Sequence, residues 1–440
     1  MKKSWLLRSG VILLTACVLA AVLLVAPFFI PLERFVPRLA SLASEKLGQP
    51  VSISSLRLQL LPTPRAVAGG IEIGKRKEVA IGELEIVPAL APLFRGDVVV
   101  RLVEARDVHL KEAALAIPDK LPKGGGGDGV RVERLRLARV KLEHRSIRMP
   151  EFDLEAELAP DLSVELARLQ TTDGALQVTL DPQAGGSSAV EIHAKQWTLP
   201  AGPPVRFDAL SAEGSLKGEA IDLRKIEGRL YGGTLSGTAR ADWSRLWQVS
   251  GNSSVDGVDV VPVQKLLGKK PQISGRLKSH ASFSARARTP DALVDALVLD
   301  GPFEVLGGAY QGYDLSKIGL KKLEAGGSTR FDELKGKVAV RGGEIKVTEL
   351  CVRSPALVAG GNVTVSAEDK LSGKLDLSIA KTAGFVGFPV ALGGTTSDPS
   401  FMPTKGYLIG AAVGTVLLPG IGTSIGSSVG TRIEGKSDCK

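Results

Sequence analysis

Histidine and cysteine, two residue types that often catalyse reactions or bind metals, are few in this 440-residue sequence and lie far apart. Its four histidines show no spacing typical of metal ligands: His109, His144, His193 and His280. Residues 422–426 match a hydrolase nucleophile elbow, but no histidine follows them to act as the base. Residues 430–437 match a phosphate-binding loop, yet only three residues follow, too few for the helix that such a loop needs. We therefore predict that the protein is not an enzyme and uses no metal and no cofactor.

The overall charge of +9, from 56 basic and 47 acidic residues, favours anionic partners. The densest basic segment, residues 131–148, alternates basic with apolar side chains. This pattern is typical of the solvated face of a strand, and it also suits attraction to anionic lipid head groups. The segment has no interleaved aromatic residues for base stacking, so nucleic acid is not an expected partner. Three cysteines are too few for a disulfide scaffold.

A long apolar segment near the N-terminus predicts a membrane anchor. Residues 11–30 carry no charge, and as a helix they span the roughly 30 Å hydrocarbon core of a bilayer. Lys2, Lys3 and Arg8 precede them, which favours an exported body. The alternatives are a cleaved signal peptide, for which the segment is too long, and a lipoprotein signal at Cys17, beyond which the apolar residues continue. The anchor residues are Val11, Leu14, Leu19, Leu24, Phe28 and Ile30.

From residue 51 onward apolar and polar residues alternate, which is typical of strands with one apolar and one solvated face. The parity changes between Ile53 and Leu56, and again between Leu137 and Val140, which indicates bends or bulges. The alternating apolar residues selected as the candidate apolar face are Val51, Ile53, Leu56, Leu58, Leu60, Val98, Val100, Leu102, Leu135, Leu137, Val140 and Leu142.

Helices are expected to be few and short, at residues 37–47, 261–267 and 289–297. Glycine pairs recur between the strand-like segments and predict hairpin turns: Gly69-Gly70, Gly185-Gly186, Gly232-Gly233, Gly307-Gly308, Gly326-Gly327, Gly342-Gly343 and Gly360-Gly361. Together these features predict a mainly β protein, in which a long antiparallel meander follows an N-terminal transmembrane helix. Residues 123–129 are expected to be a flexible Gly-rich linker.

Several segments in fixed order resemble one family. The N-terminal part has the anchor, the short helix, LGQPVSISSLRLQLLPTPR and the turn Leu93-Phe94-Arg95-Gly96. The second half has GRLYGGTLSGTARAD (228–242), VSGNSSVDGVDVVPVQKLLG (249–268), the segment 273–318, LVAGGNVTV (357–365) and VALGGTTSDPSF (390–401). Over residues 1–405 the chain resembles the AsmA-like family of Gram-negative envelope proteins.

The resemblance implies a periplasmic body tethered to the bacterial inner membrane by one pass, and a curled β-groove with an apolar interior like that of bridge-like lipid-transfer proteins. Family members are associated with phospholipid movement and outer-membrane homeostasis. The implied function is non-enzymatic: the chain would shield or convey phospholipid acyl chains, and the candidate apolar face would line the groove. The alternative is an envelope assembly or scaffold factor with a closed β core that binds outer-membrane proteins.

The implied organisation is an anchor (1–31), a membrane-proximal β part (32–122), the linker (123–129), a β-groove (130–405) and a tail (406–440). Residues 406–431 of the tail carry no charge, and their glycines recur at four-residue spacing, as in close helix contacts within lipid. Two interpretations stand, a membrane-inserted hairpin or helix and a flexible or packed tail. The candidate second membrane contact consists of Gly406, Gly410, Gly414, Gly422, Gly426 and Gly430. Expected partners are thus phospholipids and the inner membrane, with the outer membrane or its assembly proteins as further candidates.

Overall fold

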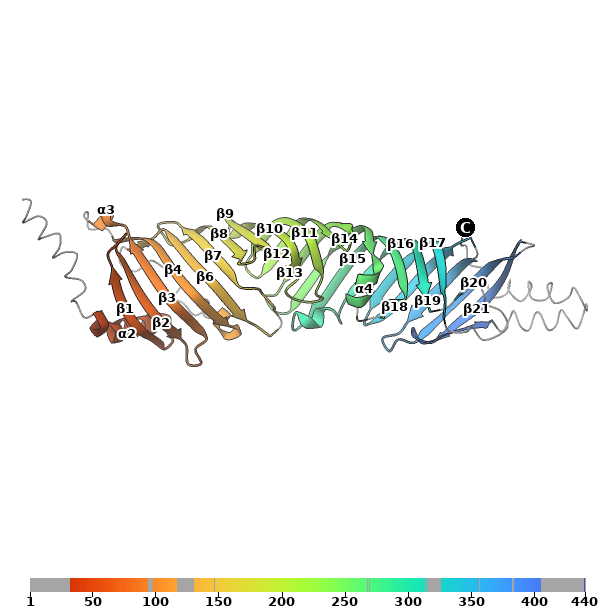
Figure 1. The fold of residues 1–440 in the computed structure, drawn as a ribbon, viewed down its shortest axis with the longest axis horizontal. Helices are drawn as coiled ribbons and strands as arrows, with labels where there is room; N and C mark the ends of the chain where they lie inside the picture. The colour runs from red at the N-terminus through yellow and green to blue at the C-terminus, as the bar shows by residue number, and fades with distance from the viewer. Residues whose placement is uncertain are drawn as a thin grey trace, which may run out of the picture. The chain divides into compact units, whose positions relative to one another are not determined.

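The computed structural model describes residues 32–404, apart from 94–97, 117–129, 146, 267, 269, 313, 315–325, 356 and 382–383, together with Cys439. This described chain is mainly β, as the sequence predicted (Figure 1). It divides into two compact units between residues 184 and 185, which we call unit 1 and unit 2. The expected anchor, the linker and the tail glycines lie outside the described residues. No helix in the part of the chain that the structure describes is long and apolar enough to cross a membrane.

Unit 1 is a single sheet preceded by a helix. Its elements are η2 (Leu32–Phe35), α2 (Val36–Leu47), β1 (Val51–Gln59), β2 (Arg65–Ile73), β3 (Val79–Pro88), α3 (Leu90–Leu93), β4 (Val98–Lys111), η3 (Glu112–Ala116), β5 (Val130–Val132), β6 (Arg134–Glu143), β7 (Phe152–Leu158), β8 (Val164–Thr171) and β9 (Leu176–Gln183). Strands β1 to β4 pair antiparallel in chain order, and so do β6 to β9.

One junction in unit 1 departs from the expected antiparallel meander. Strand β4 pairs parallel with β5 and β6, so that Val103 lies beside Leu135. A parallel pair needs a crossover of a dozen or more residues, and residues 112–129 supply that length between β4 and β5. The strands on both sides of the predicted linker therefore belong to one sheet, and the compact units divide elsewhere, after residue 184.

The predicted change of parity in β6 is confirmed. Arg139 adopts a φ of 54°, and the register with β7 shifts between Leu137 and Val140. Because of this irregularity, Leu137 and Val140 pack in one apolar cluster although their parity differs. Asp107 in β4 has the same φ, and the Arg139 guanidinium donates two hydrogen bonds of 2.7 Å to its carboxylate. These bonds hold the pKa of Asp107 below its ordinary value.

Unit 2 is an antiparallel meander in which strands β10 to β22 pair in chain order. Its elements are β10 (Ser187–Thr198), β11 (Arg206–Lys217), β12 (Ala220–Leu230), β13 (Gly233–Asp242), β14 (Trp247–Asp259), α4 (Val260–Leu266), β15 (Ile273–Ala287), η6 (Asp291–Leu293), β16 (Val298–Gln311), β17 (Ser328–Arg341), β18 (Glu344–Arg353), β19 (Leu357–Val365), β20 (Leu371–Lys381), β21 (Gly384–Gly394) and β22 (Pro399–Pro403).

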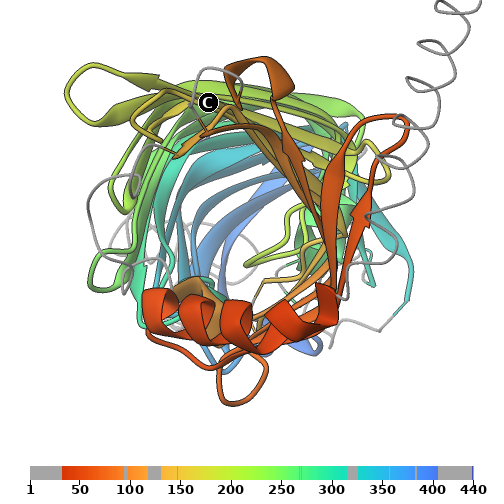
Figure 2. The ribbon, with the colours of Figure 1, turned by 90° about the vertical axis from the view of Figure 1, so that its left-hand side faces the viewer.

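The sheet of unit 2 curls. The side-chain amide of Gln272, before β15, donates a hydrogen bond to the carbonyl oxygen of Thr396, after β21. In a flat sheet six strand spacings of about 4.8 Å would separate these strands by roughly 29 Å. The bond therefore requires the intervening strands to bend round, and Figure 2 shows the green-to-blue strands of unit 2 curving in this way.

The glycine pairs have two different roles. Gly232 and Gly342 have positive φ and lie in the turns before β13 and β18, as predicted. The predictions for Gly69-Gly70, Gly307-Gly308 and Gly360-Gly361 are wrong, because these pairs lie inside β2, β16 and β19. A Cβ on Gly308 would lie 2.5 Å from the ring of Phe331. At this position glycine permits close packing against the neighbouring strand rather than a turn.

Two of the three expected helices are confirmed, as α2 and α4. Gly48 ends α2 and Gly268 follows α4, and both have a positive φ, which suits a helix C-terminus. The third helix is wrong in length, because only the 3₁₀ turn η6 forms. The residue at its N-cap is Pro290, which makes no side-chain hydrogen bond.

Candidate functional site

An unbroken row of apolar and glycine residues crosses unit 2 from β10 to β20. Each member is the register partner of the next, so all lie on one face of the sheet: Val190, Gly214, Leu223, Ala239, Gly251, Phe283, Leu299, Val340, Ile345, Val365 and Leu371. We call this side of unit 2 the apolar face. The residues that alternate with them, such as Thr238 and Arg240 on β13, are exposed on the polar face.

The row itself is only partly covered. Of the row above only Val190 is buried, and the other members are half-buried although they lie on interior strands. A second sheet packed against them would bury such side chains, as in a β-sandwich. Within the described residues, the strands of unit 2 form one meander and no opposing layer. An apolar strip therefore remains accessible along the sheet.

The apolar face is buried at two places. Near α4, Val260 packs with Val305, Phe331 and Leu334, so that this short helix lies on the face beside β15. The side-chain amide of Gln264 in α4 accepts hydrogen bonds from the backbone N–H groups of Gln272 and Ile273, which fixes the helix to the start of β15. The second cluster joins β19, β20 and β21: Leu357, Ala359, Leu375, Leu377 and Val390. The apolar face of unit 2 is thus buried only in part, at these two clusters.

In unit 1 the structure brings only part of the predicted apolar face together. Leu137, Val140 and Leu142 pack in one cluster with Ala105, Val108 and Phe152. Val140 is fully buried, so it is a core residue and its assignment as accessible lining is wrong. Half-buried positions on the strands are Val51, Ile53, Leu56, Val100, Leu102 and Leu135.

The remaining predicted lining residues do not form one surface. Leu58 on β1 is exposed, Leu60 lies beyond the end of β1, and Val98 is the first residue of β4. Val103 pairs with Leu135, so Leu102 lies on the opposite face, which is the face of Glu104. The sequence reasoning also missed the apolar face of unit 2, because its Gly and Ala members alternate weakly with Ser and Thr. The signal was present in segments such as GTLSGTARAD.

The polar face of unit 1 carries a charge network centred on Arg106. Its guanidinium lies 3.1 Å from Glu83, 3.4 Å from Glu85 and 2.9 Å from Glu104. The Glu85 and Glu104 side chains are only 7% and 8% exposed, and Arg65 adds a contact of 2.9 Å to Glu85. The hydrogen bond to Glu104, followed by the charges of Glu104, Glu85 and Glu83, raises the pKa of Arg106 against the opposing effect of burial. This arrangement is typical of structural ion pairing.

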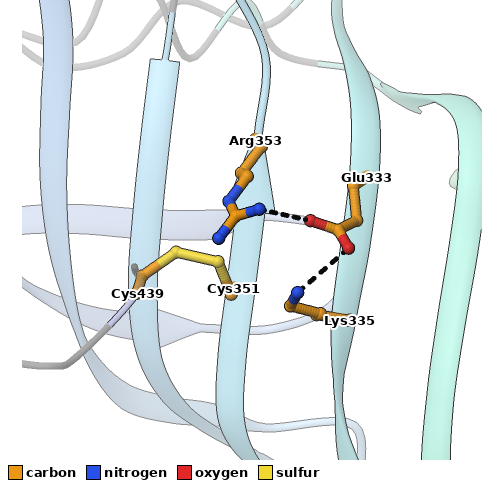
Figure 3. Close-up of a disulfide and its surroundings, with 5 residues drawn as sticks. All are labelled: Glu333, Lys335, Cys351, Arg353 and Cys439. Carbon is orange, nitrogen blue, oxygen red and sulfur yellow. Dashed lines mark hydrogen bonds and ion pairs between the residues drawn. A yellow bond between two sulfur atoms is a disulfide. The ribbon is translucent and has the colours of Figure 1, made fainter.

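The polar face of unit 2 carries a disulfide that the sequence analysis missed, between Cys351 on β18 and Cys439 (Figure 3). Beside it, Glu333 lies 3.0 Å from Lys335 and 3.2 Å from Arg353. The hydrogen bond from Lys335 is the largest cause that lowers the pKa of Glu333. Both cysteines also line an open pocket of about 850 Å³. The available signal was that Cys351 and Cys439 are the only cysteines beyond the apolar segment 11–30.

One buried polar atom of the described residues has no hydrogen-bond partner, the indole nitrogen of Trp197 on β10. Trp197 is 7% exposed and stacks on Phe207 at a centroid distance of 6.3 Å. Among the described residues, no cluster of His, Cys, Asp and Glu could hold a metal ion. The feature of unit 2 that stands out is therefore its partly accessible row of apolar side chains.

No family model, curated protein or solved structure matches the chain in comparisons with known proteins.

Proposed function

We propose that this protein is a non-enzymatic, inner-membrane-anchored periplasmic protein that shields or conveys phospholipid acyl chains along an apolar β-groove. The observation that carries the proposal is the half-buried apolar row across β10 to β20. Each methylene group removed from water contributes about 0.8 kcal/mol, so a continuous apolar strip lowers the cost of moving an acyl chain. Small members of the row, such as Gly214, Ala239 and Gly251, leave space for an acyl chain against the sheet.

Two further features support the location. The Cys351–Cys439 disulfide fits an oxidising compartment such as the periplasm, since cytosolic proteins rarely keep such bonds. The uncharged residues 11–30 fit a membrane anchor. The resemblance to the AsmA-like family agrees with both and adds outer-membrane lipid homeostasis as the process.

The test is lipid mass spectrometry on the full chain, purified in a lipid-free detergent and washed extensively. We expect phospholipid to remain bound to the wild-type protein. The matched variants are Ala239→Asp, on the apolar row, and Thr238→Asp, its exposed neighbour on β13. Because a charge on an open surface remains hydrated while it repels hydrocarbon, Ala239→Asp should lose most of the bound lipid and keep its fold.

The Thr238→Asp variant should keep both lipid and fold. A lipid-free wild-type protein, together with an Ala239→Asp variant that unfolds, would show that the face is closed and dry. That result would favour the alternative, an assembly or scaffold factor that binds outer-membrane proteins.

A further inference from the structure

The helix α2 has two apolar sides, and only one of them faces the protein. Val36, Ala40, Ala43 and Leu47 are half-buried towards unit 1. Their spacing of three or four residues places them on one side of the helix. The Ser44 hydroxyl lies on the same side, donates a hydrogen bond of 2.6 Å to the Ala40 carbonyl oxygen and accepts one of 2.8 Å from the Val51 N–H. These bonds fix α2 to the start of β1.

The second apolar side of the helix is open. Phe35, Leu39 and Leu42 follow each other at intervals of four and three residues, and they are 51%, 40% and 49% exposed. No residue of α2 is fully buried. Figure 2 shows α2, in red, lying across the end of unit 1 next to β1. The three side chains therefore form one exposed apolar stripe at the edge of the unit 1 sheet.

Cations accompany this stripe. Arg38 and Lys46 lie on the outer side of α2, and Arg34 lies in the preceding turn. None of the three takes part in an ion pair among the described residues. By contrast, most ion pairs described in unit 1 join an Arg to a Glu side chain. A stripe of Phe and Leu with free basic residues beside it is typical of a helix that lies in the head-group layer of an anionic bilayer.

The sequence that precedes the described residues also favours a lipid bilayer as the partner of this stripe. The uncharged residues 11–30 end two residues before η2 begins at Leu32. A bilayer that holds those residues is therefore within about 20 Å of chain from α2, which begins six residues after Ile30. We propose that the stripe Phe35, Leu39 and Leu42 docks α2 into the surface of an anionic lipid bilayer, and thereby holds the edge strand β1 at the membrane. The inference deepens the proposed function and rests on its membrane anchor.

The experiment places a fluorophore on the full chain in vesicles of phosphatidylcholine and phosphatidylglycerol. Cys17→Ser removes the free thiol, since Cys351 and Cys439 are bonded to each other. An environment-sensitive maleimide dye is then attached at Leu42→Cys, on the stripe, or at Ser41→Cys, the exposed neighbour on the polar side. We expect the emission from position 42 to shift to shorter wavelength with vesicles, and the emission from position 41 to stay as in water.

Removing one cation, by Arg38→Gln, should weaken the insertion equilibrium about fivefold in anionic vesicles and leave it unchanged in pure phosphatidylcholine. A chain that floats with vesicles while position 42 stays in water would overturn this inference and leave the anchor intact. A chain that does not float would overturn both. Shielding of position 42 in detergent that rises with protein concentration would show a second copy on the stripe, which also overturns it. Bound lipid, measured by mass spectrometry, reports on the groove independently.

Discussion

The polar faces of the two units are stabilised in different ways. In unit 1 the charges converge on Arg106, which contacts three carboxylates, two of them nearly buried. In unit 2 the ion pairs are smaller, such as the exposed Lys337 and Glu349 at 2.8 Å and Glu333 between Lys335 and Arg353, and a disulfide joins β18 to Cys439. Where apolar side chains stay half-buried, as along the row of unit 2, the sheet gains less packing energy. The comparison teaches that each unit gains stability on its polar face, by ion pairing in one and by a covalent bond in the other.

The largest effect is expected from the disulfide. Cys439→Ser opens a cross-link between residues 88 positions apart, and loop entropy of this size contributes about 4 kcal/mol to the free energy of unfolding. Denaturant unfolding under oxidising conditions should show this loss, and reductant should produce the same loss in the wild-type protein. Cys17→Ser is the control and should change nothing. An unchanged unfolding midpoint for Cys439→Ser would mean that the bond does not stabilise unit 2.

The next effect is expected at the centre of the unit 1 network. Arg106→Met leaves the nearly buried Glu104 without its main partner and removes one of the two arginines that contact Glu85, which should cost about 3 kcal/mol of unfolding free energy. The control is Arg57→Met, on the same face, whose exposed side chain lies 3.9 Å from Glu83 and should contribute little. Equal losses for the two variants, measured by chemical denaturation, would contradict the distinction between buried and exposed pairing.

A smaller effect with a defined pH dependence is expected at Glu333. Its pKa is lowered in the folded state, chiefly by the hydrogen bond from Lys335, so the charged form stabilises the fold above the ordinary pKa. This stabilisation is lost as the pH falls through the lowered value. Glu333→Gln should therefore cost about 1 kcal/mol at neutral pH and nothing in strong acid. Thermal unfolding of the wild-type and Glu333→Gln proteins across pH measures the difference in stability. A difference that grows as the pH falls would contradict the expected direction.

The smallest effect is expected at the exposed pair of unit 2. Lys337→Met removes the partner of Glu349, but both side chains are mostly in water and salt screens their attraction. We expect no measurable change in the unfolding midpoint. A loss like that of Arg106→Met would break the comparison, because unit 2 would then also depend on its ion pairs.

Local patterns predicted much of the secondary structure. The helix expected at residues 37–47 corresponds to α2, and the parity change between Leu137 and Val140 corresponds to the bulge at Arg139. Such features depend on neighbours in the chain. The parallel pairing of β4 with β6 and the bond between Cys351 and Cys439 join residues far apart in the sequence, so no local pattern predicted them.

For the candidate site, too, local patterns predicted one part and the tertiary structure decided the other. Alternation identified strands with one apolar face, but it could not tell an accessible residue such as Leu135 from the fully buried Val140. Glycine pairs were equally ambiguous, because a positive φ in a turn and close contact inside a sheet both require the absence of a side chain. Gly342 illustrates the first case and Gly308 the second.

The amino-acid sequence alone determined the β class, two of the three short helices and the uncharged N-terminal segment, since these follow from residue types at fixed spacing. Only the tertiary structure decided which apolar residues share a face, that the row across unit 2 is only partly covered, and that the stripe on α2 is open. The physical reason is that exposure depends on what packs against a residue, and the packing partners come from distant parts of the chain.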